Sequence, residues 1–155
     1  PAGLITAARA VNRSMPSHVA GVIGDLMWNA GVPAGEAKVL LLGWSYKAEV
    51  GDPRETPAEP LAETLISKGI KVGAWDPHLA TNDFPDDIEV VTDLSQANGY
   101  DMVVLVTAHK ACLSVDWESL AKQMRTTIVY DGRRVLDLEK LAHMGWQTHA
   151  VGKPV

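Results

Sequence analysis

Short apolar runs alternate with helix-type patterns along most of the chain. Apolar runs of strand length occupy Lys38–Leu42, Lys71–Trp75, Glu89–Val91, Met102–Thr107, Thr127–Tyr130 and Trp146–Val151. The strongest of these runs are almost free of polar residues, which is typical of parallel strands that are buried on both faces. Because helical patterns lie between the runs, the sequence predicts an α/β fold with a mostly parallel sheet and right-handed crossovers.

The longest helical pattern covers residues 3–30. Its apolar stripe recurs at helical spacing, at Val19, Val22, Ile23, Leu26, Met27 and Ala30. Pro16 predicts a break or a kink, because proline removes a backbone hydrogen bond inside a helix. Gly31 marks the end of the pattern. We therefore expect two parts, a helix over residues 1–31 and a sheet domain over residues 38–155.

A second helix is predicted after Thr56 by its start and stop signals. Thr56 is an N-cap residue, Pro57 suits the first helical position, and Glu59 completes a capping box. Gly69 supplies the left-handed position at the far end. Shorter helices are expected near residues 94–98, after the N-cap Asp116, and from the N-cap Asp137 to His143.

The junction between the first strand and this helix reads Gly43-Trp44-Ser45-Tyr46-Lys47-Ala48-Glu49-Val50-Gly51-Asp52-Pro53-Arg54-Glu55. In a parallel sheet the junction lies at the carboxyl edge, where ligands bind, and amides at a helix N-terminus attract anions. Lys47 and Arg54 add two cations. These features predict a phosphate site on a three-layer, Rossmann-like fold. The alternative is that both cations are solvated surface residues.

The usual dinucleotide fingerprint G-x-G-x-x-G is absent from this junction. Ser45 stands where the second glycine is required. Asp76, at the end of the next strand, lies 33 residues after Gly43, whereas the fingerprint has its acidic residue after roughly 20. We therefore expect the ligand to bind in a different mode from a dinucleotide on that motif.

Composition and charge narrow the class of protein. A hydrophobic fraction of 46% over 155 residues is sufficient for one globular core. The net charge of −5 argues against a nucleic-acid partner. Apolar runs are far shorter than the roughly 20 residues of a membrane span. The single cysteine, Cys112, fits a reducing compartment, so a cytoplasmic location is expected.

Four separated motifs follow one another along the chain. They are Gly43-Trp44-Ser45-Tyr46-Lys47, Asp52-Pro53-Arg54-Glu55-Thr56-Pro57, Trp75-Asp76-Pro77 and Asp131-Gly132-Arg133-Arg134. In this order and spacing they resemble the carboxyl-terminal domain of the UDP-glucose/GDP-mannose dehydrogenase family. Val11-Asn12-Arg13-Ser14-Met15-Pro16 also resembles the start of the helix that joins the two catalytic domains of that family. The resemblance covers nearly the whole chain.

The resemblance implies ligand contacts in the loop after the first strand. Lys47 is expected to contact the nucleotide sugar. Tyr46 replaces the more usual phenylalanine, and its ring either packs on the uracil or belongs to the core. Arg54 is expected to reach the pyrophosphate of NAD, the alternative being a surface ion pair with Asp52 or Glu55.

The resemblance also points to the turn after a later strand. One of Arg133 and Arg134 is expected to hold an anion, because a guanidinium can do so with two hydrogen bonds. The resemblance favours Arg134, and the other arginine is expected to pair with Asp131 or Asp137. Asp76 is expected to cap the turn that follows it, the alternative being a bond to a ribose hydroxyl.

No catalytic or metal-binding residue is predicted in this chain. The resembling enzymes use a cysteine nucleophile from a preceding part of the polypeptide, and Cys112 lies outside that motif. His78 with Asp83, Asp86 and Asp87 is the one cluster that suggests a metal. Its spacing matches no metal motif, so a solvated acidic loop is the better interpretation.

The resemblance implies a function for a longer protein of which this chain is a fragment. We expect a nucleotide-sugar-binding domain of an NAD-dependent sugar-nucleotide 6-dehydrogenase, which oxidises UDP-glucose or a UDP-N-acetylhexosamine to the uronic acid in two steps. NAD would be bound mainly by an amino-terminal domain of the same polypeptide. Alone, the chain is expected to bind UDP weakly, to oxidise no sugar nucleotide and to form a homodimer through residues 3–30. The alternative is a stand-alone nucleotide-binding or regulatory module.

Overall fold

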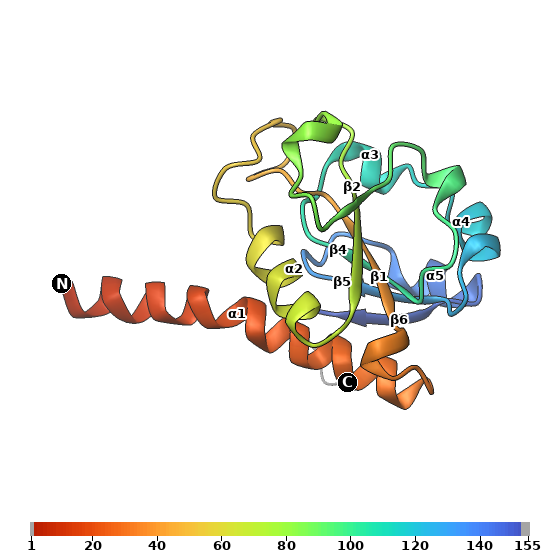
Figure 1. Cartoon of the computed structure of the whole chain (residues 1–155), viewed down its shortest axis with the longest axis horizontal. Helices are drawn as coiled ribbons and strands as arrows, with labels where there is room; N and C mark the ends of the chain where they lie inside the picture. Colours follow the sequence, from red (N-terminus) through yellow and green to blue (C-terminus); the bar gives the residue numbers. More distant parts are fainter. Residues whose placement is uncertain (1, 153–155) are drawn as a thin grey trace.

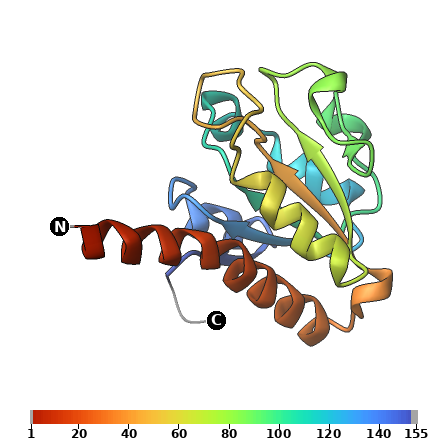
Figure 2. The same ribbon diagram turned by 60° about the vertical axis from the view of Figure 1, so that its left-hand side comes forward.

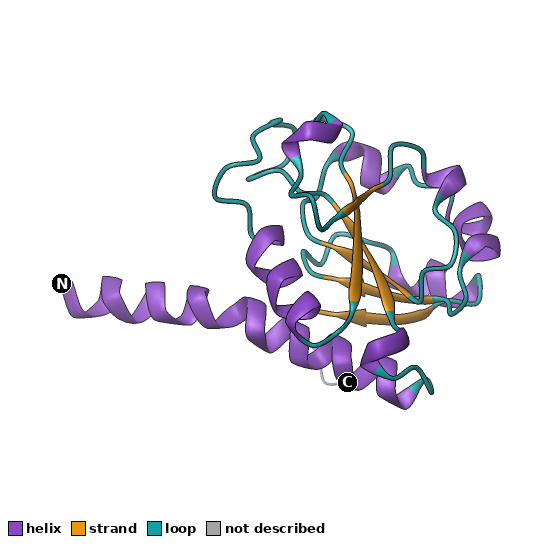
Figure 3. Cartoon of the chain, in the orientation of Figure 1, coloured by secondary structure: helices purple, strands orange, loops and turns teal. Residues whose placement is uncertain are grey.

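Six parallel strands form the centre of the protein (Figures 1 and 3). The computed structural model describes the backbone of residues 2–152 and the side chains of residues 16–152. The strands are β1 (Lys38–Leu42), β2 (Lys71–Trp75), β3 (Glu89–Val90), β4 (Met102–Leu105), β5 (Ile128–Asp131) and β6 (Gln147–Ala150). Their order is β3-β2-β1-β4-β5-β6, and every neighbouring pair is parallel. This doubly wound order confirms the expected Rossmann-like fold class.

Helices connect the strands and cover both faces of the sheet. The α-helices are α1 (Ala2–Asn29), α2 (Ala58–Ser67), α3 (Lys110–Leu113), α4 (Trp117–Gln123) and α5 (Leu138–His143), and the 3-10 helices are η1 (Ala34–Glu36), η2 (Thr81–Asp83) and η3 (Leu94–Gln96). The sequence does not predict α3, η1 and η2, because a single turn is too short to show a helical period.

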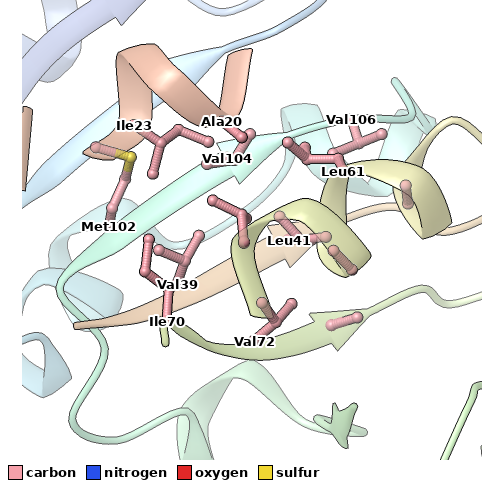
Figure 4. Close-up of a cluster of buried hydrophobic side chains, with 14 of the residues drawn as sticks. Ala20, Ile23, Val39, Leu41, Leu61, Ile70, Val72, Met102, Val104 and Val106 are labelled. Carbon is pink, nitrogen blue, oxygen red and sulfur yellow. The ribbon is translucent and has the colours of Figure 1, made fainter. Parts of the chain in front are cut away.

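Alternating strand side chains divide the core into two layers. Val39 and Leu41 of β1 point to the face that α1 and α2 cover. Leu40 and Leu42 point to the opposite face, where α3, α4 and α5 contribute buried side chains. Figure 4 shows the first layer, with side chains of α1 and α2 packed over the strands. Burial on both faces explains why the strand sequences are continuous apolar runs.

Helix α1 runs without interruption past Pro16. It extends from Ala2 to Asn29, so of the two predicted outcomes, a break or a kink, the break is wrong. Figure 2 shows instead a bend along the helix, which is the expected effect of a proline that removes one hydrogen bond without stopping the helix. The helix ends at Asn29, and Gly31 supplies the left-handed residue of the turn that follows, with a φ of 82°.

The second half of α1 packs on the sheet domain. Its buried side chains are Ala20, Ile23, Leu26 and Met27. Ala30, the last residue of the predicted stripe, is exposed. In Figures 1 and 2 the first half of the helix extends beyond the rest of the chain. The first half also contains the apolar residues Leu4, Ile5 and Ala8, which lie outside the residues whose side chains are described.

The predicted cap of α2 forms in part. The buried Thr56 accepts a hydrogen bond at its Oγ1 from the Ala58 N–H at 3.1 Å. The reciprocal bond, from the Thr56 N–H to the Glu59 carboxylate, is not among the hydrogen bonds of residues 16–152, so only one half of the capping box is present. Gly69 ends the helix as expected, with a φ of 88°.

Gly43 joins β1 to the following loop in a conformation that requires glycine. Its φ is 92°, and a Cβ there would lie 2.5 Å from Thr107 Cβ and 2.6 Å from Thr107 O.

We expect Gly43→Ala to lower the free energy of unfolding by about 2–4 kcal/mol, because left-handed strain and a steric clash add. Gly31→Ala is the control, since Gly31 has a similar φ of 82° but open space around it, and should cost about 1–2 kcal/mol. Urea unfolding followed by circular dichroism measures both, and equal losses would contradict the clash.

Candidate functional site

The buried carboxylate of Asp76 organises the loop that follows β1. Asp76 is 6% exposed. Its Oδ2 accepts hydrogen bonds from the Trp44 N–H at 2.8 Å, the Ser45 N–H at 2.8 Å, the Ser45 hydroxyl at 2.7 Å and His109 Nε2 at 2.9 Å. Its Oδ1 accepts from the His78 N–H at 2.9 Å. This last bond is the turn cap that the sequence predicts, and the other four join β2 to the turns after β1 and β4.

These hydrogen bonds keep Asp76 ionised. Burial by itself raises the pKa of this carboxyl, but the bonds from Trp44, His109, His78 and Ser45 outweigh burial and lower the pKa below its ordinary value of 3.8. The site therefore contains a fixed buried negative charge, and every donor around it is oriented toward that charge.

His109 links Asp76 to Glu49 in the middle of the loop after β1. Its Nδ1 accepts a hydrogen bond from the Glu49 N–H at 2.9 Å, so Nδ1 carries no proton. The proton is then on Nε2, which donates it to the acceptor-only carboxylate of Asp76. Thr107 adds a bond from its hydroxyl to Ser45 O at 2.8 Å. His109 is thus a fully buried, neutral histidine whose tautomer is fixed by its two partners.

A second buried carboxylate shapes the turn after β5. Asp131 is fully buried and accepts hydrogen bonds of 2.7–2.9 Å from the backbone N–H groups of Arg133, Arg134, Val135 and Leu136. Main-chain donors therefore occupy the carboxylate. Neither arginine side chain forms an ion pair with Asp131 or Asp137 within residues 16–152, so the expected arginine–aspartate pair is not found.

A cavity of about 500 Å³ opens beside these two loops. It lies between α1, α2 and the carboxyl ends of β4 and β5, at the edge where doubly wound folds bind ligands. Its lining side chains with polar groups are Tyr46, Glu55, Thr56, Tyr130 and Arg133, and the rest of its wall is mainly apolar. The cavity volume lies within the range of small-molecule sites.

The predicted ligand residues of the two loops lie at different places around this cavity. Tyr46 lines it and is 52% exposed, so the core alternative for its ring is wrong. Lys47, the next residue, is exposed on the same loop. Arg133 lines the cavity, whereas Arg134, with a left-handed φ of 58°, is not among the described lining residues. Geometry alone therefore favours Arg133, and the role of Arg134 stays a prediction.

Arg54 forms a bidentate ion pair with Asp52. Its Nε and Nη2 donate to the two oxygens of Asp52, both at 3.0 Å. These bonds lower the pKa of Asp52 to about 2. The surface ion pair considered from the sequence is therefore present. Because the Arg54 side chain is 85% exposed, it is accessible to other ligands, and its contact with NAD stays a prediction.

The N-terminus of α2 offers fewer donors to an anion than the sequence pattern suggests. Pro57 and Pro60 have no N–H, and the Ala58 N–H is bound by Thr56. In this first turn the Glu59 N–H is the remaining donor, and the Glu59 carboxylate would repel an anion. An anion at this edge must therefore depend mainly on cationic side chains.

His78 belongs to a different cluster from the one considered in the sequence. Its Nε2 lies 2.7 Å from Glu49 Oε2, and its ring lies 4.5 Å from the ring of His109, centroid to centroid. Asp83 instead accepts a hydrogen bond from the Ala80 N–H. Sequence reasoning missed Glu49 and His109 because they lie 29 and 31 positions away from His78.

Cys112 is part of the core layer beneath α3. It is fully buried, and burial raises the pKa of its thiol to about 12. A nucleophilic cysteine requires an accessible thiolate with a lowered pKa. Its environment is therefore that of a packing residue.

A doubly wound sheet with a ligand-sized cavity at its carboxyl edge defines a Rossmann-like ligand-binding domain. The family described as "UDP-glucose/GDP-mannose dehydrogenase family, UDP binding domain" matches residues 40–138. The chain therefore belongs to this family, and the resemblance of the four motifs is confirmed.

Related proteins are substantially longer than this chain. A UDP-N-acetyl-D-mannosamine dehydrogenase of Pyrococcus horikoshii is 34% identical over 134 residues, which cover 86% of this chain and 30% of the relative. UDP-glucose 6-dehydrogenase 1 of Oryza sativa subsp. japonica is 26% identical, and the match covers 76% of this chain and 30% of the relative. The chain thus spans about a third of the length of the relatives it matches.

Solved structures share the whole fold. The structure of a UDP-D-ManNAc dehydrogenase from Pyrococcus horikoshii has a TM-score of 0.82 at 30% identity, over 97% of this chain and 34% of that protein. An NDP-N-acetyl-D-galactosaminuronic acid dehydrogenase from Methanosarcina mazei Go1 has a TM-score of 0.84 at 26% identity. The match covers 96% of this chain and 31% of that protein. Among the described residues, no helix combines the length and the apolar character of a membrane span.

Asp76→Asn should destabilise the protein and change its response to acid. We expect a loss of about 2–4 kcal/mol in the free energy of unfolding at pH 7, because an amide cannot accept every N–H bond of the carboxylate. Since the pKa of Asp76 is lowered in the folded state, its contribution is complete above the ordinary pKa and is lost as pH falls through the folded-state value. The variant should therefore lose less stability than the parent between pH 7 and pH 3.

Urea unfolding at the two pH values measures this difference. Asp87→Asn is the control, because Asp87 is exposed. If both variants showed the same stability and acid response, Asp76 would not be the centre of the loop.

Proposed function

We propose that this chain binds the uridine diphosphate part of a UDP-sugar, as one domain of a longer NAD-dependent sugar-nucleotide 6-dehydrogenase. The observation that carries the proposal is the cavity at the carboxyl edge of a sheet whose residues 40–138 match a UDP binding domain. Relatives with the names UDP-N-acetyl-D-mannosamine dehydrogenase and UDP-glucose 6-dehydrogenase support a UDP-hexose or a UDP-N-acetylhexosamine as the substrate.

The cavity offers complementary chemistry to the parts of a nucleoside diphosphate. The exposed ring of Tyr46 provides an aromatic face for the base. Lys47, next to Tyr46, and Arg133, on the opposite loop, supply positive charge for the diphosphate. Arg134 is the alternative to Arg133 that the resemblance favours. Because the N-terminus of α2 has few free donors, these cations carry most of the expected attraction.

In the longer enzyme this chain would anchor the nucleotide while another domain binds NAD. The reaction converts the primary alcohol of the sugar into a carboxylate by two hydride transfers to NAD, and the group that attacks the sugar would come from outside this chain. Arg54 is the residue through which this domain would reach the NAD pyrophosphate. A cytoplasmic location stays a prediction from the single cysteine.

Helix α1 is proposed to link the two domains and to form a symmetric dimer. At 1.5 Å per residue its 28 residues span about 42 Å. Its second half is part of the core, and its first half extends beyond the sheet domain (Figures 1 and 2). A two-fold pair would use the same helix surface twice, as in most soluble dimers.

Removal of residues 1–15 should convert a dimer into a monomer without unfolding the domain. The deletion leaves the buried half of α1 in place, whereas deletion of the whole helix would remove Ile23 and Met27 from the core. Sedimentation equilibrium at tens of micromolar should give about twice 16.7 kDa for the parent and a monomer for the truncated chain. A monomeric parent, or a truncated chain that still dimerises, would reject the proposal.

Lys47→Ala should weaken the binding of UDP by roughly 1–3 kcal/mol, the range for a lost hydrogen bond to a charged group. Isothermal titration of the chain with UDP, and with GDP and NAD for comparison, measures the change. Arg133→Ala and Arg134→Ala, each titrated in the same way, identify which arginine faces the diphosphate. The control is Lys140→Ala on α5, because Lys140 is exposed on the helix layer opposite the cavity. Unchanged UDP binding in all three site variants would refute the assignment of this cavity.

A further inference from the structure

Three metal-ligating side chains from distant parts of the chain meet at the carboxyl edge of the sheet. Glu49 lies in the loop after β1, His78 in the turn after β2 and His109 in the turn after β4. Their ligating atoms all lie within 4.8 Å of one another. Glu49 Oε2 is 2.7 Å from His78 Nε2 and 3.6 Å from His109 Nδ1. Because β2, β1 and β4 are neighbours in the sheet, the fold itself brings the three loops together at one end of the molecule (Figure 1).

A second layer of hydrogen bonds directs two of these side chains toward a common point. Asp76 accepts the Nε2 proton of His109, which leaves the lone pair of Nδ1 facing Glu49. The Lys110 N–H donates to Glu49 Oε1 at 3.3 Å, which leaves Oε2 facing the histidines. A carboxylate behind a histidine is the arrangement that fixes the tautomer of metal-binding histidines.

We propose that Glu49, His78 and His109 bind a divalent transition-metal ion, with Zn²⁺ as the best match. Two imidazole nitrogens and one carboxylate oxygen are a ligand set that Zn²⁺ accepts, whereas Mg²⁺ and Ca²⁺ prefer oxygen ligands alone. The side chains of Glu49 and His78 are 38% and 37% exposed, so a water molecule can complete a tetrahedral site. The inference is independent of UDP binding, because none of the three residues lines the cavity.

Binding of the ion requires two small local changes. The ion takes the place of the hydrogen bond between His78 Nε2 and Glu49 Oε2, and the ring hydrogen of the bound His78 lies on Nδ1. The ion also replaces the Glu49 N–H as the partner of His109 Nδ1. Glu49 has a left-handed φ of 63° in an exposed loop, so its freed N–H can turn to water.

A bound ion would fasten the loop after β1 to the turns after β2 and β4. The same loop carries Tyr46 and Lys47. The ion would therefore act as a structural cross-link of the loop, and its effect on stability is measurable with no nucleotide present. An ion that binds only the folded chain raises the midpoint of thermal unfolding.

Titration of the untagged, chelator-treated chain with Zn²⁺ alone tests the proposal. We expect one Zn²⁺ per chain, a higher midpoint of thermal unfolding with the ion, and no comparable effect of Mg²⁺. Co²⁺ in place of Zn²⁺ should give the intense visible absorption of a tetrahedral site. Glu49→Gln and His78→Ala should each weaken Zn²⁺ binding by at least ~10-fold, the lower end of the loss known for changes around metal sites.

His143→Ala is the matched control, because His143 is an exposed histidine on α5. It should bind Zn²⁺ as tightly as the parent. Because Glu49 and His78 are half exposed, their variants should fold, and circular dichroism without metal checks this. The proposal is overturned if the parent binds no Zn²⁺, or if Glu49→Gln and His78→Ala bind it as tightly as His143→Ala does.

Discussion

The buried carboxylate of Asp76 is the interaction on which the candidate site depends. It collects donors from the turn after β1, from its own turn after β2 and from His109 after β4, so one charge holds three neighbouring strand ends in register. A buried charge without partners would be strongly destabilising. The loop that carries Tyr46 and Lys47 therefore has a defined path although most of its side chains are exposed.

Asp131 organises the turn after β5 in the same way, as a buried carboxylate surrounded by hydrogen-bond donors. Four backbone N–H groups surround its carboxylate, and this wrapped turn presents Arg133 to the cavity. Asp131 accepts hydrogen bonds from backbone N–H groups, and Asp76 accepts them from backbone N–H groups, the Ser45 hydroxyl and His109. Among the described residues neither carboxylate forms an ion pair with Lys47 or Arg133, so these two cations stay available to a ligand. The cavity between the two loops is mainly apolar and has Arg133 and Glu55 as its charged lining residues, and the exposed Lys47 lies on the adjoining loop.

Helix α1 belongs both to the core of the domain and to the wall of the candidate site. Its buried residues belong to the same core layer as α2 and the strands, so the helix is an integral part of the domain. Pro16 and Val19 of α1 also line the cavity. A change in the direction of α1 would therefore alter the wall of the candidate binding site.

The sequence by itself determined the strands, the long helices and the edge of the sheet that carries the candidate cavity, because these follow from local periodicity and from the parallel order. It also identified Tyr46, Lys47 and Arg54 as loop residues and Asp76 as a turn cap. Only the tertiary structure decided that Arg133 lines the cavity. Only the tertiary structure showed that His78 and His109 lie next to Glu49. Such contacts join residues dozens of positions apart, and the path of each loop depends on buried hydrogen bonds that have no local sequence period.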